Sequence, residues 1–183
     1  MVEWAGRPLR PGAPPVPRVA EAPRADSAAR AAVRSRLWDS SSVNGARAGI
    51  TAAAAWAAAE PLLGRAFATT YSDVRLLGRA VTERRVWPVA GIALHLANGA
   101  VFGTVFERLG FAGVRQGVLA AQAENLALWP GMIVADRVHP DRRAGTWPPL
   151  FTTPRILGYE IATHAIFGAV LGALVRDTTR QRR

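Results

Sequence analysis

The sequence contains no cysteine and no lysine in its 183 residues. Without cysteine the chain cannot form a disulfide-stapled secreted domain, a cysteine zinc site or a thiol-dependent active site. All 23 basic residues are arginines, and with 13 acidic residues they give a formal net charge of +10. The motifs HExxH, GxSxG and the Walker phosphate loop are also absent, so the common signatures of metalloproteases, serine hydrolases and P-loop NTPases are missing.

The first part of the chain also lacks long apolar runs. Residues 1–45 hold six of the 13 prolines and seven arginines. Such a segment buries too little apolar surface to offset the entropy lost on ordering. We therefore expect a disordered N-terminal tail over residues 1–45 and a short basic tail over residues 177–183. The PxxP spacing between Pro8 and Pro17 could also dock on an SH3-like groove.

The rest of the chain is dominated by four apolar stretches, each close to the roughly 20 residues that a helix needs to cross a bilayer. They contain a single arginine, Arg115, and three acidic residues. Excluding charge in this way is typical of membrane-spanning helices, because a central charge costs about 2.5–3.5 kcal/mol on insertion scales. The stretches are residues 48–64, 87–106, 112–135 and 156–175.

These features predict an all-α, polytopic membrane protein with a four-transmembrane-helix bundle over residues 46–176. A soluble bundle is the alternative, but residues 156–175 lack the polar stripe that a soluble helix shows. An even number of spans puts both termini on one side, and that side carries 14 arginines against nine. The positive-inside rule then favours cytoplasmic termini, although near the spans alone the count is nine against nine.

Two longer links join the predicted spans. Residues 65–86 could form a short amphipathic helix on the membrane surface, or an ordinary loop. Residues 136–154 are rich in proline and threonine, which favours an ordered, turn-rich loop. The arginines are spread over the tails and links instead of forming one face. We therefore expect contact with anionic lipid headgroups and no nucleic-acid partner.

The second and fourth spans repeat one pattern. HLANGAVFG begins at His95 and HAIFGAVLG begins at His164, an offset of 69 residues. With two crossings per unit, such a duplication predicts two parallel two-helix repeats. Residues four apart share a helix face, so each histidine is followed on its face by two glycines. We expect these glycines to be helix-packing positions; they are Gly99, Gly103, Gly168 and Gly172.

Ionisable residues inside the spans point to a functional layer. Each histidine is the ninth residue of its span, so both lie about 13 Å deep at 1.5 Å per residue. Ionisable groups at that depth face the bundle interior or water. We expect a layer of His95, His164 and Glu124, with Glu60 and Glu160 one turn outward and Asn98 and Asn125 close by.

The layer is compatible with several functions. It could relay protons or bind a small cation, because histidine titrates near neutral pH and burial shifts carboxyl groups toward that range. Two histidines at matched depth could ligate a b-type haem. A metal could be held by His95, His164, Glu124 and Glu160. The same residues could also be structural, fixing the helices in register or serving an interaction subunit, with no reaction catalysed.

Several motifs also resemble a known family. AWAAAEP ends the first span, GIALHLANGAVFG lies in the second and YEIATHAIFG in the fourth. These runs are similar to the YagU-like family of small bacterial inner-membrane proteins of unknown function. The resemblance covers Gly45 to about Asp177 and implies a helical membrane bundle with a link to survival in acid. The family's marked positions would fall on Glu60, His95, Glu160 and His164, whereas Glu124 and Asn125 depart from its pattern.

Overall fold

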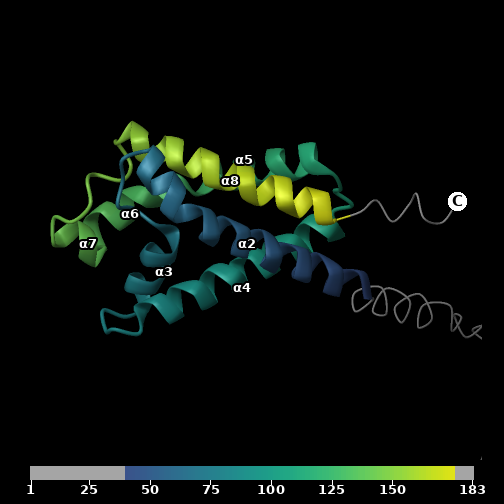
Figure 1. Cartoon of the computed structure of the whole chain (residues 1–183), viewed down its shortest axis with the longest axis horizontal. Coiled ribbons are helices and arrows are strands. Elements are labelled where there is room, and N and C mark those ends of the chain that lie inside the picture. The colour runs from purple at the N-terminus through teal and green to yellow at the C-terminus, as the bar shows by residue number, and fades with distance from the viewer. Residues whose placement is uncertain (1–39, 176–183) are drawn as a thin grey trace, which may run out of the picture. The chain divides into compact units, whose positions relative to one another are not determined.

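The structure, a computed structural model, describes residues 40–175, and within that range all regular elements are helices (Figure 1). The expected tails lie outside the described residues, except for the overlap at 40–45. Four of the helices are long and three are short. They are α2 (Ser40–Ala66), α3 (Asp73–Val81), α4 (Trp87–Arg108), α5 (Val114–Leu128), α6 (Gly131–Val138), α7 (Pro140–Arg143) and α8 (Pro154–Leu174).

The long helices pack side by side in the order α4, α2, α8, α5. Helix α2 lies between α4 and α8, and α5 packs on the far side of α8 (Figure 1). Helices α4 and α5 make no extensive contact with each other. The all-α expectation is confirmed. The two end helices of the row, α4 and α5, flank a cavity, and the Asn98 side chain of α4 is hydrogen-bonded to the Glu124 carboxyl group of α5.

Glycines allow close packing within two helix pairs, α2 with α4 and α5 with α8. A Cβ atom placed on Gly49 of α2 would collide with the backbone oxygen of Gly99 of α4, and one on Gly103 would collide with the oxygen of Gly45. Helices α5 and α8 meet in the same way, through the four glycines Gly113, Gly117, Gly168 and Gly172. In both pairs only the absence of a side chain lets the backbones approach this closely.

The third predicted span, residues 112–135, is not one straight helix. Helix α5 ends at Leu128, α6 starts at Gly131, and the two are bent by 52°. Pro130 explains the break, because proline has no backbone N–H and its ring clashes with the preceding turn. The bend carries α6 to the same end of the described fold as α3 and α7 (Figure 1).

The link over residues 65–86 contains a helix, one of the two alternatives left open by its sequence. Helix α3 begins at Asp73 because the Ser72 side chain accepts a hydrogen bond from the Arg75 N–H at 3.2 Å. It does not rest freely on a surface. Gly78 and Gly91 bring its backbone against α4, and Val74 is buried.

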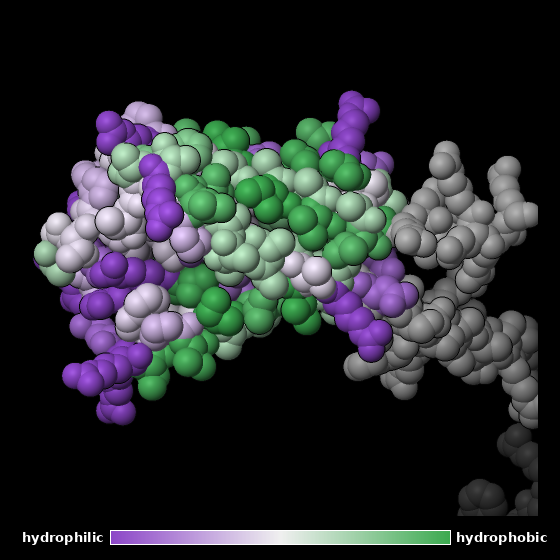
Figure 2. All heavy atoms as spheres, viewed as in Figure 1, coloured by the Kyte–Doolittle hydropathy of each residue, from purple (hydrophilic) through white to green (hydrophobic). Residues whose placement is uncertain are grey.

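Helices α4 and α8 are each long and apolar enough to cross a membrane, and α5 with α6 make a third candidate if the bent pair is one span. On the face shown in Figure 2, apolar side chains cover the middle of the described helices and hydrophilic ones gather toward the ends. Helix α2, with 27 residues, is long enough but is not among the candidates by composition. Its alanines are only weakly apolar, and Glu60 and Pro61 lie within it.

The glycine contacts lead to a test of the packing. In Gly117→Ala the new methyl group would collide with the Gly168 oxygen, so we expect a loss of about 1–3 kcal/mol, the range found for overpacked cores. Gly131→Ala is the control, because a Cβ there meets nothing within 4 Å. Thermal unfolding in detergent should show a lower midpoint for Gly117→Ala alone. Equal midpoints for the two variants would contradict the close α5–α8 contact.

Candidate functional site

A cavity of about 230 Å³ lies between α4 and α5, the two end helices of the row. Helices α2, α4, α5 and α8 line its sides, while α3 and α6 line one end. Of the seven residues predicted for the polar layer, six line this cavity, and Glu60 does not. Those six are His95, Asn98, Glu124, Asn125, Glu160 and His164.

His164 lies between two carboxylates. Its Nδ1 atom is 2.8 Å from the backbone oxygen of Glu160 and 3.3 Å from Oε2 of the same residue. Its Nε2 atom is 3.9 Å from Oε2 of Glu124. Both partners of Nδ1 can only accept hydrogen bonds when Glu160 is ionised, so Nδ1 carries the proton and Nε2 of the neutral ring has a lone pair. His164 can therefore take a second proton on the side of Glu124.

His95 has a different environment, although its sequence context matches that of His164. Its Nε2 atom is 3.2 Å from the backbone oxygen of Ala53, so Nε2 is the protonated nitrogen. Trp56 lies against both histidines, with ring centroids 4.9 Å from His95 and 4.4 Å from His164. The two imidazoles are therefore packed on the same indole ring.

This packing does not fit a haem held by both histidines. Axial ligation needs an open slot between the two rings, and the Trp56 indole occupies the space beside both of them. A metal held by His95, His164, Glu124 and Glu160 is not favoured either. Among residues 40–175, no three His, Asp or Glu side chains are arranged to hold an ion.

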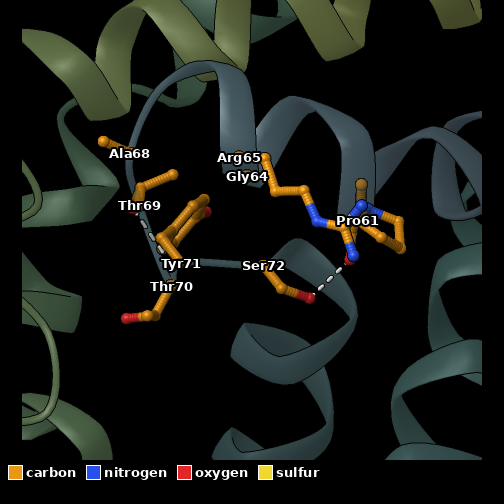
Figure 3. A pocket seen from close by; sticks show the side chains of 9 residues that line it. Pro61, Gly64, Arg65, Ala68, Thr69, Thr70, Tyr71 and Ser72 are labelled. Carbon is orange, nitrogen blue, oxygen red and sulfur yellow. Dashed lines mark hydrogen bonds between the residues drawn. The ribbon is translucent and has the colours of Figure 1, made fainter.

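Glu60 holds the start of α3. Its carboxylate accepts hydrogen bonds from the Ser72 hydroxyl at 2.5 Å and from the Asp73 N–H at 2.9 Å. The Asp73 N–H is one of the free backbone donors at the N-terminus of α3, where a negative charge is also favourable. Figure 3 shows Ser72 directed at this carboxylate, beside Pro61 and Arg65. Glu60 lines a separate, open pocket of about 450 Å³.

The predicted amides lie at the α4 and α5 walls of the cavity. Asn125 is buried, and its Nδ2 atom is 3.5 Å from Oε1 of Gln122. Gln122 in turn donates to the backbone oxygen of Ile161 at 2.8 Å, which ties α5 to α8. Asn98 is exposed on α4. An exposed amide at the middle of an apolar helix marks the edge of the cavity.

Sequence reasoning missed Asp73 and Trp56. Asp73 lies in the link between spans, but α3 turns it into the cavity, where its Oδ1 atom accepts a hydrogen bond from the Tyr71 hydroxyl at 2.9 Å. Burial raises the pKa of Asp73 well above its ordinary value, and the nearby carboxylates of Glu160 and Glu60 raise it further. In the sequence, only the amphipathic spacing of residues 65–86 could have indicated that Asp73 belongs to the site.

Outside the cavity, a charged cluster fixes α3 to the loop around α7. Buried Asp141 receives two hydrogen bonds from the Arg75 guanidinium, at 2.9 and 2.6 Å, and Arg79 is 3.4 Å away. His139 stacks on Trp147 with ring centroids 4.6 Å apart. Burial lowers the pKa of His139, so the ring is neutral at neutral pH. This cluster holds Asp73 in place from outside the cavity.

No protein-family model, curated protein sequence or solved structure matches the chain.

The environment of Asp73 predicts how stability depends on pH. The folded protein keeps the Asp73 proton at a pH where the unfolded chain, with a carboxyl pKa of about 3.9, has lost it. This stabilisation is therefore present at low pH and is lost as pH rises through the folded pKa. Asp73→Asn stays neutral and should flatten the decline in unfolding midpoint that the unmodified chain shows as the pH rises above about 3.9.

The measurement is thermal unfolding of detergent-solubilised protein across that pH range. Glu83→Gln is the matched control, because Glu83 is exposed and pairs only with Arg143 on the surface. It should keep the pH dependence of the unmodified chain. If Asp73→Asn and Glu83→Gln follow the same curve, Asp73 does not hold a proton in the folded state.

Proposed function

We propose that the chain is an integral membrane protein of a bacterial inner membrane with four spans, formed by α2, α4, the bent pair α5–α6, and α8. Supporting this, the α2–α4 pair and the α5–α8 pair are both antiparallel and meet through matched glycines. The matched contacts support two parallel repeats. Helix α2 is only weakly apolar, but its contacts with α4 and α8 would keep it inserted.

The four-span topology can be tested by labelling, because the chain has no native cysteine. Leu109→Cys places a thiol in the short link after α4, and Arg85→Cys and Thr152→Cys place thiols at the opposite ends of α4 and α8; all three side chains are exposed. With cytoplasmic termini, a membrane-impermeant maleimide should label positions 85 and 152 in intact cells but position 109 only after lysis. Labelling of all three from outside would contradict the proposed topology.

Within that topology, we propose that the cavity handles protons. The observation that carries this proposal is His164, buried between Glu160 and Glu124 with one ring nitrogen free to accept a proton. Histidine changes charge near neutral pH, and ionisable groups inside a membrane are costly, so their presence there by default indicates a functional site. Asp73 continues the chain of acidic groups from Glu160 toward Glu60 and the end of the fold.

The resemblance to YagU-like proteins fits this proposal, since that family is linked to survival in acid. Membership in that family is itself part of the proposal. We also propose that the exposed arginines contact anionic lipid headgroups. A homo-oligomer is a further part of the proposal. A purely structural role for the polar residues is the competing function.

Proton flux into liposomes separates the two functions. His164→Ala removes the acceptor between the carboxylates, so we expect the rate of dissipation of a pH gradient to fall by about tenfold or more, a change of about 1.4 kcal/mol in the barrier. His95→Ala should also reduce flux, because His95 supports the Trp56 ring that packs on His164. Glu83→Gln, at the surface, is the control.

If both histidine variants fold, insert and conduct as the unmodified chain does, the polar residues have a structural role. The same conclusion would follow if the unmodified chain showed no proton flux above that of empty liposomes. Circular dichroism and size-exclusion chromatography of each variant establish that a loss of flux is not a loss of folding.

A further inference from the structure

His139 lies at the start of α7, outside the cavity, and both of its ring nitrogens make hydrogen bonds. Nε2 is 3.2 Å from the backbone oxygen of Leu76 on α3, and Nδ1 is 3.2 Å from the backbone nitrogen of Asp141. A carbonyl oxygen can only accept a hydrogen bond, and a backbone N–H can only donate one. Nε2 therefore carries the proton of the neutral ring, and Nδ1 accepts the bond that caps α7.

This pair of hydrogen bonds requires the neutral ring. A second proton would go to Nδ1, which holds the lone pair, and that N–H would then face the Asp141 N–H as donor against donor. The ring is also held in place, because His139 is only 3% exposed and stacks on Trp147 with the two planes 8° apart. Burial lowers the pKa of His139 accordingly. Protonation of His139 must therefore change the turn that contains it.

The Asp141 carboxylate offers a second partner to the protonated ring. Its Oδ2 atom is 3.9 Å from Nδ1 of His139, which is too far for a hydrogen bond but close enough to attract a charged imidazole. The same carboxylate already accepts two hydrogen bonds from Arg75 and lies 3.4 Å from Arg79, both on α3. A charged ring would therefore compete with these arginines for the carboxylate that ties α3 to the turn.

Charged groups from three helices and from the link after α3 surround His139. The two arginines of α3 disfavour a charged ring, whereas Asp141 favours it. Asp136 and Glu83 are each paired with an arginine of α7, at 2.7 and 3.4 Å. Asp141 is therefore the carboxylate to which a charged ring would turn. The surrounding groups are Arg75 and Arg79 on α3, Glu83 in the link, Asp136 on α6, and Asp141, Arg142 and Arg143 on α7.

We propose that His139 is an acid-sensitive latch on the turn over residues 139–147. The neutral ring caps α7 and bonds to the backbone of α3. After protonation, Nδ1–H turns to the Asp141 carboxylate, so the cap is lost and the hold of Asp141 on the arginines of α3 weakens. Acid thereby releases the turn from α3, the helix that carries Asp73 into the cavity. The latch does not require proton movement through the cavity, so either proposal can fail without the other.

The direction of the pH dependence follows from the two environments of the ring. In the released turn the ring is in water, where the pKa of histidine is about 6.5, and in the closed turn burial lowers that pKa. The closed turn therefore has its full stability above about pH 6.5 and loses stability as the pH falls below that value. The ratio of released to closed turn should rise by up to about tenfold per pH unit, until the closed form takes the proton as well.

Hydrogen exchange of the full chain, purified in a neutral maltoside detergent, measures this ratio. The Thr146 N–H donates to the backbone oxygen of Asp141 at 2.9 Å, so it exchanges with solvent when the turn opens. The observed rate is divided by the intrinsic exchange rate at each pH, which leaves the protection due to structure. We expect this protection to fall between pH 7.5 and 5.5, by up to about tenfold.

His139→Asn separates the latch from the other effects of acid. Asparagine is among the best helix N-cap residues, its amide oxygen can accept the Asp141 N–H, and it takes up no proton in this pH range. The loss of Thr146 protection in acid should therefore disappear. His95→Asn is the matched control, because His95 lies on α4 and bonds to Ala53, and this variant should keep the loss. The same loss in His139→Asn as in the unmodified chain would overturn the proposal.

If His139→Asn fails to fold, the unmodified chain provides a second test. Ring-nitrogen NMR shifts of its three histidines report the tautomer and the charge of each ring, and the His139 signals are identified by their contact with the Trp147 ring. We expect His139 to carry its proton on Nε2 at pH 7.5 and to titrate below about pH 6.5, together with the loss of Thr146 protection. A proton on Nδ1 at pH 7.5, or a titration that leaves Thr146 equally protected, would show that His139 is not a latch.

Discussion

The close backbone contact between glycines is the constraint on which the rest of the described fold depends. Gly49 and Gly99 join α2 to α4, and Gly117 and Gly168 join α5 to α8. Because helices that touch through backbone cannot slide without collision, these contacts fix which side chains share a level. His95 lies one turn from Gly99 and His164 one turn from Gly168, so the glycines also fix the height of both histidines against Trp56.

Much of this arrangement could be predicted from the sequence. The apolar runs gave the positions of α4 and α8 to within two residues, and the spacing of four put His95 and His164 on the glycine faces. Those inferences depend only on helix periodicity, which is local. The bend at Pro130 was missed because the apolar run continues through it, and tertiary packing decides whether such a proline kinks or ends a helix.

The residues that complete the site could not be predicted, because they depend on contacts between distant segments. Trp56 looked like one apolar residue of an alanine-rich helix, and only the packing of α2 between α4 and α8 sets it against both histidines. Glu60 was expected beside the polar layer, yet it caps α3. The residues next to a carboxylate in a helix do not determine whether it will face a cavity or the end of another helix.

The two helix pairs also differ in sequence at one position that matters for the proposed function. At an offset of 69 residues, Gly91 of α4 corresponds to Glu160 of α8. Gly91 lets the backbone of α3 lie directly on α4, and this contact brings Asp73 into the cavity. Glu160 occupies the matching place on α8 and places its carboxylate beside His164. Helices α4 and α8 therefore differ at this position: α4 packs against α3 there, whereas α8 carries a carboxylate there. The polar groups meet in the cavity because of this difference.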